Sequence, residues 1–111
     1  MNGLVEGRIV HYVLTEEDAN QINITRLASQ LAREKVQTEN KVILHTGNTV
    51  MAYEHFPAII VRVFHNEYGQ GEHGVNLQVF LDGNDSHWVC SRRFAEPADL
   101  KAGTWHWVEP A

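Results

Sequence analysis

The hydrophobic pattern is strongest between residues 56 and 85, where two apolar segments flank a glycine-containing stretch. Residues 58–65 are rich in β-branched and aromatic side chains, and residues 75–81 carry an apolar side chain at every second position. A period of two is typical of a strand with one face in the core, so both segments are predicted strands. The polar residues 82–85 predict a tight turn, and residues 87–92 an antiparallel partner strand.

The same period predicts which way individual side chains face. In the first strand, two sets of side chains lie on opposite faces: Ile59, Val61 and Val63 on one, and Ile60, Arg62 and Phe64 on the other. In the second strand, the inward-facing set is Val75, Leu77, Val79 and Leu81. Pro57 cannot donate a ladder hydrogen bond, so we expect it to open its strand rather than lie inside it.

The chain before this block predicts a strand followed by a helix. Residues 7–14 have strand composition, and the apolar period then lengthens to that of a helix over about residues 16–35. Thr15 and Asp18 have the spacing of a capping box, and acidic residues fill the expected first turn. The apolar stripe comprises Ile24, Leu27, Ala28, Leu31 and Ala32, with Arg26 elsewhere on the helical wheel. This stripe needs cover, either from the sheet or from a second copy of the chain.

The remaining segments complete the fold prediction. Residues 41–45 suggest a short strand, residues 46–49 a turn, and residues 104–108 a final strand with two tryptophans on one face. Short strands without βαβ alternation predict a mainly β protein, a single domain over residues 1–111. The expected architecture is a small antiparallel, partly open SH3-like barrel, with the helix inserted after the first strand.

Composition and charge limit which classes of partner and which cellular locations we expect. The net charge of −5 argues against a nucleic-acid backbone as partner, because proteins that bind it usually present a basic face. The first residues lack a charged region followed by a long apolar stretch, so we expect no secretory signal. No apolar run approaches the length of about 18 residues that a membrane span requires, so we expect no membrane span. Cys90 is the only cysteine, which excludes an internal disulfide and a cysteine-rich zinc site. Its apolar surroundings in the sequence predict a buried, inert thiol.

No motif predicts a catalytic, metal or cofactor site. Seven histidines are present, but no two lie within four residues of each other: His11, His45, His55, His65, His73, His87 and His106. Residues 82–85 resemble part of a calcium loop, yet Arg93 stands where the bidentate glutamate belongs. The glycines at 69–74 lack the lysine and hydroxyl residue of a phosphate loop. We therefore expect a non-enzymatic protein without a cofactor or bound metal.

Three tryptophans are the most informative side chains for binding, because one indole ring buries a large area at small entropic cost. The barrel core is the alternative place for each of them. With polar residues expected on the outer face of the sheet they form the candidate binding set: Trp88, Trp105, Trp107, Arg62, Asn76, Gln78, Arg92 and Arg93.

Several stretches together resemble a family of small proteins encoded by tailed bacteriophages and prophages. They are GRIVHYVLTEEDANQIN, HTGNTVMAYEHFPAIIVRVF, VNLQVFLDGND followed by Trp88, and GTWHW, in the family's order along nearly the whole chain. The sequence departs from the family pattern at residues 52–54 and 91–93. The resemblance implies a phage-encoded origin and a compact fold. It implies no activity, so no functional residue is transferred.

These observations lead to two functional hypotheses. The first is a phage accessory protein that acts by protein–protein contact with a phage or host protein and forms a homo-oligomer through the helix or a sheet edge. It would act in the cytoplasm of the infected bacterium or in the virion. The alternative is a protein that sequesters a host signalling nucleotide, with a tryptophan stacked on the base and arginines facing the phosphates.

Overall fold

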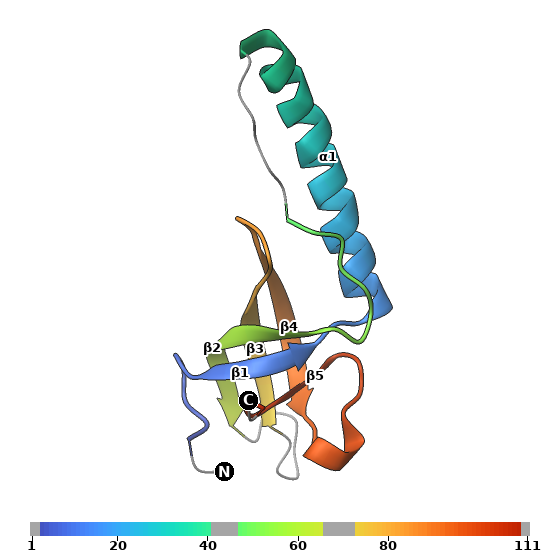
Figure 1. Cartoon of the computed structure of the whole chain (residues 1–111). Coiled ribbons are helices and arrows are strands. Elements are labelled where there is room, and N and C mark those ends of the chain that lie inside the picture. Colours follow the sequence, from blue (N-terminus) through green and yellow to red (C-terminus); the bar gives the residue numbers. More distant parts are fainter. Residues whose placement is uncertain (1–2, 41–46, 66–72, 110–111) are drawn as a thin grey trace.

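The computed structural model describes residues 3–40, 47–65 and 73–109. The elements follow in the order β1 (Ile9–Val13), α1 (Glu16–Asn40), β2 (His55–His65), β3 (His73–Phe80), β4 (Ser86–Phe94), a 3₁₀ turn (Pro97–Asp99) and β5 (Thr104–His106). The strands form one small barrel, and α1 projects away from it as a long arm (Figure 1). The molecule is correspondingly elongated, with extents of 56 × 26 × 24 Å.

The barrel is closed in the strand order β1-β2-β3-β4-β5. Neighbouring strands are antiparallel except β4 and β5, which are parallel. The short β5 closes the barrel, because Tyr12 of β1 and Phe94 of β4 both pair with Trp105. The predicted fold class is therefore confirmed: a mainly β, SH3-like barrel with one helix after the first strand. The barrel is closed rather than partly open, because β5 pairs with both β1 and β4, and its pairing with β4 is parallel.

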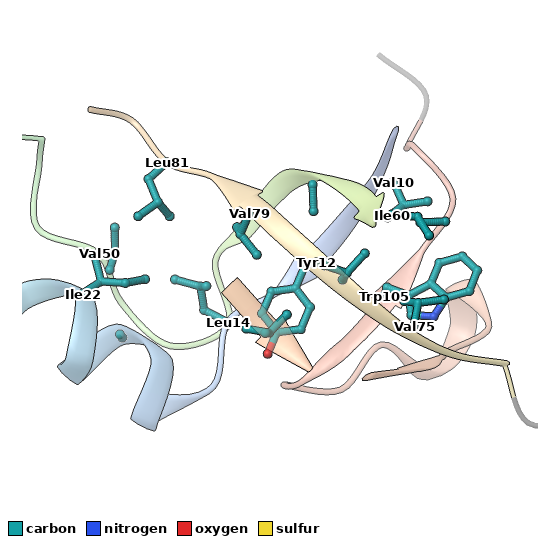
Figure 2. Close-up of a cluster of buried hydrophobic side chains, with 14 of the residues drawn as sticks. Val10, Tyr12, Leu14, Ile22, Val50, Ile60, Val75, Val79, Leu81 and Trp105 are labelled. Carbon is teal, nitrogen blue, oxygen red and sulfur yellow. The ribbon is translucent and has the colours of Figure 1, made fainter. Parts of the chain in front are cut away.

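The core lies inside the barrel and extends to the base of α1. Trp105 is fully buried near Val10 and Ile60, Tyr12 fills the middle, and Ile22 of α1 closes the other end (Figure 2). All four inward positions predicted for β3 and the residue after it are buried: Val75, Leu77, Val79 and Leu81.

Strand β2 departs from the predicted alternation. The register of β2 against β3 shifts between Ile60 and Arg62, which is a β-bulge that adds Val61 to one strand only. Because of this extra residue, Ile60 and Val63 both face the core, whereas Val61 is 43% exposed. The prediction that Val61 and Val63 share a face was wrong, since a bulge breaks the period of two.

Pro57 lies inside β2 as its third residue, so the prediction that it opens the strand was also wrong. The neighbouring Ala58 is the first β2 residue that pairs with β3. In β2, the backbone N–H of Ile60 donates to the Arg8 carbonyl on the β1 side. Because backbone N–H groups alternate sides along a strand, the Pro57 nitrogen faces the β3 side. Pairing with β3 starts only at Ala58, so the missing N–H of Pro57 interrupts no hydrogen bond.

Helix α1 begins where the sequence predicts and ends later, at Asn40 rather than near residue 35. The capping box is confirmed: the Asp18 N–H donates to Thr15 Oγ1 over 2.9 Å, and the Thr15 N–H donates to Asp18 Oδ2 over 3.1 Å. The strand predicted at 41–45 lies outside the described residues. No helix among the described residues is long and apolar enough to cross a membrane.

Candidate functional site

Within residues 16–32, whose side chains the structure describes, helix α1 is attached to the barrel through its first three turns. The buried residues on this part of the helix are Asp18, Ala19, Ile22 and Arg26. Ile22 joins the core beside Val50, and Asn23 exchanges two hydrogen bonds with the Val50 backbone. The face that docks is thus centred on Ile22 and Arg26, not on the stripe that the sequence indicated.

Arg26 locks this docked face to two loops. Its guanidinium makes a bidentate ion pair with Asp85, with Nε and Nη2 each 2.8 Å from a carboxylate oxygen. The same guanidinium donates to the Asn48 backbone carbonyl, and the Asn48 side chain donates to Asp82 over 2.5 Å. Gly47 has to be glycine, because a Cβ there would lie 2.3 Å from the Asp82 carbonyl oxygen. The acidic turn at 82–85, which resembles part of a calcium loop in sequence, therefore binds the guanidinium of Arg26.

Asp18 is a second polar anchor at the start of α1. Besides the cap, its carboxylate accepts a 2.5 Å hydrogen bond from the Tyr12 hydroxyl and lies 3.0 Å from His87 Nε2. Burial alone would raise the pKa of Asp18, but the hydrogen bonds from His87, Tyr12 and Thr15 outweigh it and hold the pKa well below its usual value. Burial, followed by the bond to Asp18, raises the pKa of Tyr12, so this hydroxyl keeps its proton.

The predicted apolar stripe lies on the other side of α1 and is exposed. Ile24 is 68% exposed and Leu27 and Leu31 are each 59% exposed, with Ala28 and Ala32 also exposed. Nothing in the described part of the chain covers these residues. The stretch from residue 19 to residue 32 contains one charged residue, Arg26, and that side chain is buried in its ion pair. We name the exposed residues Ile24, Leu27, Ala28, Leu31 and Ala32 the helix stripe.

A pocket of about 320 Å³ lies where α1 meets β4. Its lining combines helix and hairpin residues: Gln21, Ile22, Thr25, Leu81, Asp85, Ser86, His87 and Trp88. Trp88 is 52% exposed, so of the two places that the sequence left open for it, core or surface, it occupies the surface. It pairs across the sheet with Gln78, another member of the candidate set.

Of the other two tryptophans, Trp105 lies in the barrel core and Trp107 is partly buried against it. Trp105 is fully buried, and Trp107 packs against the core with its ring 5.2 Å from that of Trp105. Arg8 covers Trp107, with its guanidinium carbon 4.9 Å from the ring centroid. The alternative left open by the sequence, that a tryptophan is core, holds for Trp105, whereas Trp107 lies at the edge of the core.

The polar members of the candidate set do not converge on one place. Arg62 pairs with Asn76, and the Asn76 side chain accepts a 2.9 Å hydrogen bond from the Ser91 N–H. Arg92 lies over the Tyr12 ring and 3.9 Å from Asp18, and Arg93 is exposed on β4. None of the arginines in the set lines the pocket beside Trp88.

Two other features differ from expectation, the exposure of Cys90 and the gathering of three histidines. Cys90, predicted to be buried, is exposed, because its neighbour Val89 takes the inward position of β4. Among histidines that the sequence keeps far apart, His11, His55 and His106 all approach the Glu109 carboxylate. Hydrogen bonds from His106 and His55 lower the pKa of Glu109 to about 2, so this carboxylate is ionised. Strand register, which no local motif encodes, was the missing signal.

Comparison of the chain with protein-family models, with curated proteins and with solved structures finds no match.

Proposed function

We propose that the protein is a non-enzymatic accessory protein that acts through protein–protein contact, and that its helix stripe binds a second copy of the chain. The observation that carries this proposal is the exposure of Ile24, Leu27 and Leu31 along one side of an arm that projects from the barrel (Figure 1). Apolar side chains spaced by three and four residues are those that interlock between paired helices.

Charge favours a second copy as the occupant. A protein with a net charge of −5 is repelled by its own copy wherever acidic surfaces meet. The stretch from 19 to 32 presents no exposed charge, so two such helices can approach without this penalty. Depletion of charge is also the compositional mark of interface centres. A two-fold pair would place the same stripe on both sides of the contact.

Helix length supports the same conclusion. Helix α1 has 25 residues and is therefore about 37 Å long, although the buried residues among its described side chains, 16–32, lie between positions 18 and 26. Isolated helices of this kind are marginal in water, because most helical stability in proteins comes from packing of an apolar face. A partner helix along the stripe would supply that packing.

The biological setting is proposed from the sequence resemblance. A chain similar to small proteins of tailed phages and prophages would act in the cytoplasm of an infected bacterium or in the virion. A symmetric assembly built on a projecting helix suits either place, since it would present two or more barrels to a phage or host protein.

A second candidate is small-ligand binding, favoured by the exposed Trp88 ring beside the pocket of about 320 Å³. It ranks lower for a nucleotide, because the pocket is lined by Asp85 and by none of the arginines expected to face phosphate. Native mass spectrometry of protein taken directly from cells tests it: a spectrum without a retained small molecule argues against this candidate.

The assembly proposal is tested by light scattering coupled to size exclusion over a range of concentrations. We expect the wild-type protein to be a dimer or larger. Leu27→Glu should be monomeric, because burying a carboxylate in the middle of the helix stripe is costly when no opposite charge pairs with it. Met51→Glu is the matched control, since Met51 is 69% exposed but lies outside α1. It should assemble like the wild type.

Two results would overturn this proposal. One is a wild-type protein that stays monomeric at the highest concentration reached. The other is a Leu27→Glu variant that assembles as the wild type does. Circular dichroism of both variants ensures that a change in assembly is not a loss of helix.

A further inference from the structure

The histidines of one barrel face form a cluster that the proposed function does not use. Residues that pair across strands share a face of the sheet, and His11 of β1 pairs directly with His106 of β5. His55 of β2 pairs with Val13, two residues further along β1 on the same face as His11. Tyr12 and Trp105 point to the core, so this face is the outer one. Barrel closure thus gathers three imidazoles from three neighbouring strands.

One carboxylate oxygen lies at the meeting point of these rings. Oε1 of Glu109 is 2.5 Å from His55 Nδ1, 2.5 Å from His106 Nε2 and 3.4 Å from His11 Nδ1. The ring centroids of His55 and His11 are 5.1 and 5.7 Å from that of His106. Three imidazole nitrogens therefore point at a single oxygen atom, which has two lone pairs to offer.

We propose that His11, His106 and Glu109, with His55 as a further nitrogen ligand, bind a divalent transition-metal ion of the zinc type. The ligand atoms of His11, His106 and Glu109 already lie within 4.8 Å of one another. A tetrahedral zinc ion with bonds of about 2.0–2.1 Å needs its ligand atoms about 3.4 Å apart, so small side-chain rotations suffice. Imidazole and carboxylate are the donor types that zinc takes when no thiolate is available.

The placement of His106 suits a ligand that binds through Nε2. Its side chain is 4% exposed, and its Nδ1 is buried without a hydrogen-bond partner among the described residues. An ion at Nε2 would give Nδ1 no partner, so the support comes from Nε2: in this buried ring it points at the Glu109 carboxylate, where the other imidazoles converge. The other ligands reach solvent: His11 is 24%, His55 33% and Glu109 42% exposed. An ion can therefore enter from the Glu109 side.

A metal here would strengthen the weakest seam of the barrel. Strand β5 is held to β1 by two residue pairs and to β4 by two. The ion would link β5 to β1 and β2 and hold the segment that carries Glu109 across them. Because such an ion binds the folded chain and not the unfolded one, it would raise the thermal midpoint.

The test uses the full chain without a polyhistidine tag, stripped with EDTA and titrated with zinc chloride in a calorimeter. We expect one zinc ion per chain and a rise in the thermal midpoint at saturation. Glu109→Gln and His11→Gln should each bind zinc at least about tenfold more weakly. Glu96→Gln is the matched control, because this exposed residue lies outside the cluster, and it should bind zinc as the wild type does.

A wild-type chain that takes up no zinc at these concentrations overturns the proposal. So does a Glu109→Gln variant with unchanged affinity, because that exposed side chain can be replaced without disturbing the core. Light scattering of the same samples keeps this result separate from assembly through the helix stripe, which lies outside the cluster.

Discussion

Asp18, Arg26 and His106 are buried polar residues with different degrees of satisfaction. The carboxylate of Asp18 and the guanidinium of Arg26 each have several partners with good geometry. His106 uses Nε2, and its Nδ1 has no hydrogen-bond partner in the described part of the chain. Complete satisfaction is expected of groups that hold a fold together, whereas an unpaired buried nitrogen calls for an explanation. This contrast separates the anchors of α1 from the histidine cluster.

Stability at acid pH depends on Asp18. Its pKa is lowered in the folded chain, so its stabilising effect is complete above the unfolded value of about 3.9 and is lost as the pH falls through the folded pKa. Asp18→Asn should lower the free energy of unfolding at pH 7 by about 2 kcal/mol, because hydrogen bonds to a buried charge are lost. The groups that face this carboxylate are Tyr12 on β1 and His87 and Arg92 on β4, and all three are still present in Asp18→Asn.

Urea denaturation at several pH values between 7 and 3 measures the effect. The difference between wild type and Asp18→Asn should shrink below about pH 4, where Asp18 of the unfolded wild-type chain takes up a proton while Asp18 of the folded chain is still ionised. Asp99→Asn is the control, because Asp99 is 70% exposed and pairs with Lys101 only at the surface. A wild-type to Asp18→Asn difference that stays constant down to pH 3 would contradict this account.

At the scale of helices and strands, features set by residues close together in the sequence could be predicted, and features set by residues far apart could not. The capping box could be read from the sequence because Thr15 and Asp18 are three residues apart. The docked face of α1 could not, because Arg26 meets Asp85 across 59 residues and turns the helix so that the apolar stripe faces outward. The bulge at Val61 has no sequence mark either. The histidine cluster needed the register of β1 with both β2 and β5.

The attachment of α1 depends on the Arg26–Asp85 ion pair. Asp85→Ala should destabilise the chain by about 3 kcal/mol, because it leaves the guanidinium of Arg26 buried without its carboxylate. Chemical denaturation measures the loss, with Asn84→Ala of the same turn as the control, since Asn84 is exposed. Adding Arg26→Leu to Asp85→Ala should restore part of the stability, because the unpaired charge is then gone. Simple additivity of the two changes would exclude a coupled pair.

At the scale of the whole molecule, the barrel and the arm have separate tasks. The barrel buries the core and gathers the histidines on its outer face, while α1 carries the helix stripe away from both. The resulting shape is unusual for the chain length: the Cα radius of gyration is 16.4 Å, against about 13 Å for a compact domain of this size. A projecting helix accounts for that difference (Figure 1).

Small-angle X-ray scattering of monomeric Leu27→Glu should therefore give a radius of gyration near 16.4 Å, with the asymmetric distance distribution of an elongated particle. The monomeric variant is the right sample, because assembly of the wild type would add a second source of elongation. A value near 13 Å would mean that α1 folds back and covers its own stripe, which would remove the surface proposed to bind a second copy. A value near 16.4 Å, together with assembly of the wild type, would leave the stripe as the contact that a second chain completes.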